Sequence, residues 1–103
     1  MDLKNMMKQV QNIQEQINSM QGQLAEKTIE ASSGGGMVTV TANGKQEVIA
    51  VNIAPEIVNP DDISMLQDLI TAAVNTALKS SKSMMQEELS KITGGLKIPG
   101  LNL

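Results

Sequence analysis

Five lysines have the residue type and the spacing needed to bind an anion. Lys4 and Lys8 are four residues apart, and Lys79 and Lys82 are three apart, so each pair would share one face of a helix. Lys91 follows further along the second segment. Ammonium groups spaced in this way can neutralise phosphates of a nucleic acid. We therefore predict that these five lysines bind nucleic acid; the alternative is that they face only water, as exposed helix lysines usually do.

The distribution of charge favours basic ends on an acidic chain. The net charge is −3. Residues 1–14 carry two lysines against one aspartate, and residues 79–103 carry four lysines against two glutamates. Residues 15–78 hold two lysines and eight acidic residues. Because the local field decides where an anion docks, the two ends of the chain are the expected contact regions.

Several residue types that carry other chemistry are missing. The sequence has no His, Cys, Arg or aromatic residue. It therefore lacks the usual general base, the thiolate nucleophile, the imidazole and thiolate metal ligands, and the rings that stack on single-stranded bases. Without Arg, bidentate contacts to phosphate are excluded too. We predict no enzyme activity, no metal or other cofactor and no small-molecule substrate, and we expect lysine contacts to duplex phosphates with little sequence preference.

Two long helices that would carry these lysines are predicted from the apolar periodicity. The first spans residues 3–26, where apolar residues recur every three or four positions. The second begins at Pro60, with Asn59 as its N-cap, and ends before Gly94-Gly95. We expect the start of the first helix and the end of the second to project from the rest of the molecule and to present the lysines.

Three strands are predicted between the helices, at residues 28–31, 37–42 and 45–53, which are rich in β-branched residues. The dipeptide Asn43-Gly44 favours a two-residue hairpin turn. That turn would pair Ala42 with Lys45, Val40 with Glu47 and Val38 with Ile49. The face expected to lie under the helices then consists of Val38, Val40, Ile49, Val51 and Ile53.

The predicted fold class is α+β, in the order helix, three-stranded antiparallel sheet, helix. Residues 1–93 would form one domain, and residues 94–103 a flexible tail containing Gly and Pro. The second face of the sheet and its open edge remain too apolar for water, which predicts a homodimer. The residues expected at the dimer interface are Met37, Val48, Ala50 and Met84.

Three stretches of the sequence are distinctive in combination: Met7-Lys8-Gln9 at the start of a Gln-rich helix, Gly36-Met37-Val38-Thr39-Val40 followed by Asn43-Gly44, and residues 66–77, Leu-Gln-Asp-Leu-Ile-Thr-Ala-Ala-Val-Asn-Thr-Ala. In these stretches the chain resembles the YbaB/EbfC family of bacterial nucleoid-associated proteins. The Gly/Pro-containing tail is similar as well. The resemblance implies a homodimer with projecting helices that binds double-stranded DNA, and roles in nucleoid organisation and gene regulation. The absence of Arg departs from the family's habit.

A second function stays open on the sequence alone. Projecting helices could instead grip another protein, as in an adaptor or a chaperone-like clamp, with the lysines serving solubility. No apolar stretch reaches the length of a membrane span and no secretory signal is visible, so no membrane partner is expected. The predicted location is the cytoplasm, at the nucleoid.

Overall fold

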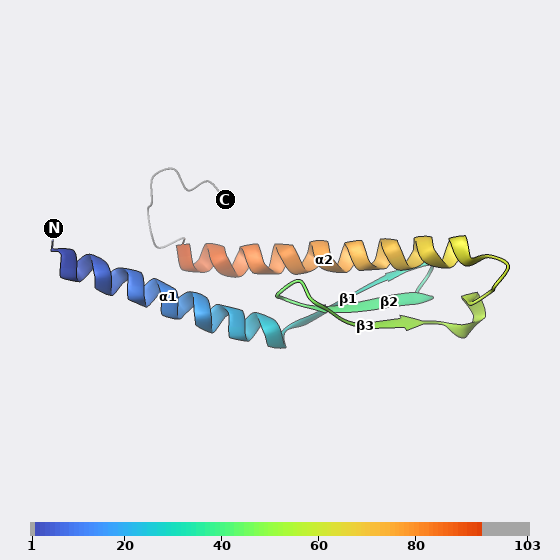
Figure 1. Ribbon diagram of the computed structural model, residues 1–103, viewed down its shortest axis with the longest axis horizontal. Helices are drawn as coiled ribbons and strands as arrows, with labels where there is room; N and C mark the ends of the chain where they lie inside the picture. Colours follow the sequence, from blue (N-terminus) through green and yellow to red (C-terminus); the bar gives the residue numbers. More distant parts are fainter. Residues whose placement is uncertain (1, 94–103) are drawn as a thin grey trace.

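One long helix covers a face of a small antiparallel sheet, and a second long helix extends away from one end of that sheet (Figure 1). The computed structural model describes residues 2–93, so the predicted tail at 94–103 lies outside the described residues. The elements are α1 (Leu3–Glu26), β1 (Thr28–Ser33), β2 (Val38–Asn43), β3 (Val48–Ile53), the short 3₁₀ helix η1 (Pro55–Ile57) and α2 (Ile63–Thr93). The predicted α+β class and element order are confirmed.

Helix α1 has the bounds that its apolar periodicity predicts. The Asp2 carboxylate accepts a hydrogen bond from the Lys4 N–H at 3.2 Å and caps the first turn. At the other end, Lys27 adopts an extended conformation, and its N–H still donates to the Gln23 carbonyl at 3.2 Å. The chain can therefore leave the helix directly into β1.

Helix α2 begins three residues later than predicted. The Asp62 N–H donates to the Asn59 carbonyl at 2.9 Å, which closes a turn before the helix. The Asp62 carboxylate then accepts the Met65 N–H at 3.2 Å. The N-cap of α2 is therefore Asp62 and not Asn59. The side-chain oxygen of Asn59 instead accepts a hydrogen bond from the Asp61 N–H at 3.0 Å, within the turn before the helix.

The predicted register between the second and third strands is wrong. Val38 pairs with Ile53, Val40 with Val51, and Ala42 with Val48, with an irregularity at Thr41/Ala42. The connection is longer than two residues because the Asn43 side-chain oxygen accepts the N–H groups of both Lys45 and Glu47, at 2.9 and 3.1 Å. Gln46 adopts a positive φ of 64° to complete this turn. The sheet order is β1-β2-β3, so β3 is an edge strand.

The core lies between α2 and the first two strands. Its fully buried members are Val38, Val40 and Ala42 of β2 with Ala73 and Ala77 of α2. The two small alanines let α2 approach the sheet closely. Strand β3 is left uncovered: Val51 was predicted to lie under the helices and is 42% exposed. The sheet therefore has an apolar, exposed edge strand.

The β2–β3 connection packs against both helices. The Gly44 N–H donates to the carbonyls of Leu24 and Lys27 at 2.8 and 3.0 Å, at the end of α1. Ser81 of α2 donates its hydroxyl to the Asn43 carbonyl at 2.6 Å and accepts the Gln46 N–H at 2.9 Å. These bonds set where α1 and α2 stand relative to the sheet. From there α1 runs antiparallel to α2 and extends beyond its end (Figure 1), giving an elongated molecule of 69 × 25 × 16 Å.

Candidate nucleic-acid interface

Lys4 and Lys8 lie on the part of α1 that extends past α2. Both side chains are exposed. At ~100° per residue they fall on the side of the helix opposite to Met6, Val10 and Ile13. Neither ammonium group forms an ion pair within residues 2–93. This end of the molecule therefore presents two free cations about one helical turn apart.

Lys79 and Lys82 are also exposed, but they do not lie at a projecting tip. They flank Ser81, whose hydroxyl is bound to the β2–β3 connection, so this turn of α2 sits over the end of the sheet. Because Ala77 and Ser81 are buried toward the sheet, Lys79 points away from it. The expectation that both pairs share the projecting ends is thus wrong for this pair.

The two lysine pairs form separate basic surfaces on one chain. Leu24 contacts Gly44, whose loop is bonded to Ser81, so Leu24 and Ser81 lie at similar positions along the long axis. Lys4 lies twenty residues before Leu24 on the same helix, which corresponds to ~30 Å of helix rise. The interval exceeds the Debye length of ~8 Å at physiological salt, so the pairs act as independent sites.

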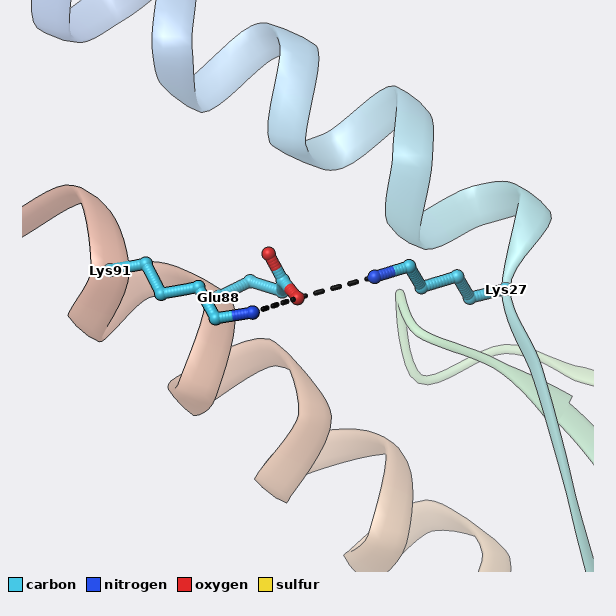
Figure 2. Close-up of polar contacts among 3 residues, drawn as sticks. All are labelled: Lys27, Glu88 and Lys91. Atoms are coloured by element: carbon cyan, nitrogen blue, oxygen red, sulfur yellow. Dashed lines mark hydrogen bonds and ion pairs between the residues drawn. The ribbon is translucent and has the colours of Figure 1, made fainter.

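Lys91 is placed differently from the other four predicted lysines, because it is engaged by a carboxylate (Figure 2). Its Nζ lies 3.2 Å from Glu88 Oε1, and the same oxygen lies 3.2 Å from Lys27 Nζ. The Glu88 side chain is 18% exposed, whereas Lys91 is 71% exposed. Lys27 comes from the end of α1, so the carboxylate ties the two helices together. The Lys91 ammonium group can still donate hydrogen bonds to an anion, but Glu88 partly neutralises its charge, unlike that of the other four predicted lysines.

These contacts shift the titration of Glu88. Hydrogen bonds from Lys91 first and Lys27 second, with the charges of both lysines adding to them, hold the pKa of Glu88 below its ordinary value. Its carboxylate is therefore ionised at neutral pH. The side chain also lines a hollow of about 350 Å³ between the helices, together with Met20 and Ile92.

Comparison with known proteins decides the family. The sequence profile of the YbaB/EbfC DNA-binding family matches residues 1–96. The chain belongs to the YbaB/EbfC DNA-binding family. It is 52% identical over 101 residues to a nucleoid-associated protein of Clostridium novyi, covering 98% of this chain and 89% of that one. It is 54% identical over 99 residues to a nucleoid-associated protein of Syntrophobacter fumaroxidans, covering 96% and 90%.

The fold of this YbaB/EbfC member is also found in a solved structure. The crystal structure of an uncharacterized protein from Helicobacter pylori superposes with a TM-score of 0.84 at 20% identity. The match covers 91% of this chain and 99% of that one. At this level of identity the likeness concerns the fold, and it supports the helix–sheet–helix arrangement described above.

Lys45 is a candidate that sequence reasoning missed in this YbaB/EbfC chain. It was assigned to the third strand, within the acidic middle of the sequence. In the structure Lys45 is exposed in the β2–β3 connection, and the next residue, Gln46, bonds to Ser81 between Lys79 and Lys82. Lys45 therefore places a further exposed cation at this end of the sheet. No local sequence signal reveals this, because the contact joins residues 35 positions apart.

The residues predicted for the dimer interface lie in two places. Val48 and Ala50 are exposed on β3, and Met37 is 37% exposed beside the end of that strand, where its carbonyl accepts the Ala54 N–H at 2.8 Å. Met84 is half-buried on α2, close to one turn beyond Ser81. Pairing places Val48 on the α2 side of the sheet and Ala50 on the open side, whereas both were expected on the open side.

Two further kinds of feature, a metal site and a membrane-spanning helix, can be checked in the described part of the chain. Within residues 2–93, no group of three or more His, Cys, Asp or Glu side chains is placed to hold a metal ion. Neither of the two long helices, over the residues described, is apolar enough to cross a membrane.

Proposed function

We propose that this chain binds double-stranded DNA as a homodimer, mainly through contacts between lysine ammonium groups and phosphates. The contact residues are Lys4, Lys8, Lys79, Lys82 and, in a lesser role, Lys91. Membership of a DNA-binding family supports DNA as the ligand. The relatives named nucleoid-associated proteins support a location at the nucleoid in the bacterial cytoplasm, with roles in nucleoid organisation and gene regulation.

The observation that most supports this proposal is that most of these lysines form no ion pair with a carboxylate of the described residues. Among the described lysines, only Lys27 and Lys91 form ion pairs, both with Glu88. Lys4, Lys8, Lys79 and Lys82 keep exposed ammonium groups on outward faces of long helices. A lysine that already faces a carboxylate must share or give up that ion pair to reach a phosphate, so it adds less to the binding of DNA than an unpaired lysine does. These four residues are therefore the most effective contacts.

A homodimer supplies what one chain lacks. The lysine pairs of a single chain are separate, so each pair alone would bind weakly. Two subunits present four such pairs, and contacts made together raise the overall affinity through effective concentration. The uncovered strand β3, with Val48, Ile49 and Val51 each 42–55% exposed, supports association because such an apolar edge strand is poorly suited to water.

The charge-reversal variant Lys4→Glu with Lys82→Glu tests the proposed contacts. We expect loss of duplex binding in a mobility-shift assay, with the same circular dichroism and the same mass as the parent. Glu15→Gln, which removes a negative charge from the exposed part of α1 that carries Lys8, is the matched control and should strengthen binding. If the double variant shifts DNA as well as the parent, the lysine contacts are wrong and an adaptor that grips another protein through α1 is favoured.

A further inference from the structure

The exposed end of α1 carries an apolar surface that no described residue covers. Leu3, Met6, Met7 and Val10, here called the tip patch, are 45–71% exposed and line a shallow hollow of about 330 Å³. At ~100° per residue, the centre of the patch lies ~130° around the helix from the midpoint of Lys4 and Lys8, and Met7 is its nearest member, ~60° from Lys4. Further along the same stripe, Ile13 and Ile17 are half-buried and Met20 is buried, so the exposure is confined to the part beyond α2.

The place where α2 ends makes one segment of the same chain the natural cover. Ile92 lines the hollow between the helices together with Gln16 and Met20 of α1. Because the two helices are antiparallel, the axis of α2 at its last residue, Thr93, points along α1 toward the tip patch (Figure 1). Val10 lies ~9 Å of helix rise beyond Gln16, and Leu3 lies ~20 Å beyond it. The ten residues 94–103 can span up to ~33 Å when extended, so they reach the whole patch.

The composition of residues 94–103 fits an apolar groove better than it fits a solvated linker. Four of its ten residues are large and aliphatic (Leu96, Ile98, Leu101 and Leu103), and Lys97 is its only charged side chain. Pro99 disfavours helix for the residue before it, and in an extended segment Leu96 and Ile98 point to the same side. Gly94-Gly95 allows the chain to turn away from the α2 axis.

We propose that residues 94–103 dock in an extended conformation on the tip patch of the same chain, with Leu96 and Ile98 packed against Leu3, Met6, Met7 and Val10. This cover removes an apolar surface from water and leaves the lysine face of α1 free. This docking does not depend on whether the chain binds DNA.

Paramagnetic relaxation tests this docking in the full chain. The sequence has no Cys, so Asn102→Cys provides a single site for a nitroxide spin label, and methyl-¹³C methionine provides signals on both ends of the molecule. We expect selective loss of the Met6 and Met7 methyl signals. The Met65 signal should persist, because Met65 lies at the start of α2, ~42 Å of helix rise from Thr93.

Two matched samples make the outcome decisive. Adding Leu96→Ser and Ile98→Ser to the labelled chain should restore the Met6 and Met7 signals. A mixture of spin-labelled chains without ¹³C and ¹³C chains without the label reports contacts between copies, and it should show no loss. Intact Met6 and Met7 signals in the labelled chain, or loss that occurs equally in the mixture, would overturn the proposal; the latter would assign the patch to a second copy.

Discussion

At the scale of single residues, the described lysines divide into two groups with different tasks. Lys27 and Lys91 share one oxygen of Glu88 and join the end of α1 to α2. The others form no ion pair with a carboxylate among the described residues: Lys4, Lys8, Lys45, Lys79 and Lys82. Counting charge along the sequence does not separate these groups, since Lys91 was expected to act like the others. The i,i+3 spacing of Glu88 and Lys91 was the one sequence feature that could have indicated an ion pair at Lys91.

The Glu88 contact predicts how the stability depends on pH. The folded pKa lies below the ordinary value of 4.5, so the contribution to the free energy of unfolding is complete above 4.5 and is lost as the pH falls through the lower folded pKa. We expect Glu88→Gln to lower the thermal midpoint at neutral pH, with the difference from the parent shrinking below pH 4.5.

Thermal unfolding followed by circular dichroism across this pH range measures the effect. Glu87→Gln is the control, because the neighbouring carboxylate forms no ion pair within residues 2–93. A difference between Glu88→Gln and the parent that stays constant through acid pH would contradict the role assigned to the ionised carboxylate.

At the scale of elements, the positions of both helices depend on the β2–β3 connection. A Cβ on Gly44 would meet Leu24 Cδ2 at 2.6 Å, its carbonyl oxygen at 2.8 Å and its Cβ at 2.9 Å. Gly44 is thus required by the close approach of α1, and not by a positive φ. Ser81, fully buried, fixes α2 against the same connection through two hydrogen bonds.

The substitution Gly44→Ala should therefore destabilise the protein. Overpacking against backbone costs ~1–3 kcal/mol, since the carbonyl of Leu24 cannot rotate away. Gly22→Ala is the matched control: nothing lies within 4 Å of its Cβ, and α1 should gain ~0.5–1 kcal/mol in helix stability. Urea unfolding of both variants measures the two free energies. Equal stability of Gly44→Ala and the parent would show that α1 does not pack on this turn as described.

The elements themselves were largely predictable, because their signals are local. The stripe from Leu3 to Leu24 gave the bounds of α1, and β-branched runs located all three strands. The register of β3 was not predictable, because Asn43-Gly44 alone favours a two-residue turn, whereas Leu24 and Ser81 hold a longer one. The same limit applies to the site: Lys4 and Lys8 followed from sequence, but the place of Lys79 and Lys82 depends on the contacts of Ser81.

At the scale of the whole molecule, the elongated shape leaves β3 as an uncovered apolar edge. Val48→Lys together with Ala50→Lys places a charge on each face of that strand. We expect the parent to have the mass of a dimer by light scattering at micromolar concentration, and the double variant to have the mass of a folded monomer. Both residues are exposed in the single chain, so their replacement should leave the circular dichroism unchanged.

The control variant carries two lysines on a surface that is not expected to take part in the dimer. Thr76→Lys with Ser80→Lys, on the exposed side of α2 away from the sheet, should keep the dimer mass. If the parent itself has the mass of one chain, the homodimer is wrong, and the lysine pairs would have to act singly.

The most direct measurement is the salt dependence of duplex binding by the full chain. Each lysine–phosphate contact contributes about −0.9 to the slope of log affinity against log salt concentration. We predict a steep negative slope for random-sequence duplex. For Lys4→Gln with Lys8→Gln the slope should be shallower by about 1.8 for each subunit whose pair contacts DNA, and therefore by about 3.6 when both subunits of the dimer do. An affinity that does not change with salt, or equal slopes for the parent and this variant, would contradict the proposed lysine contacts.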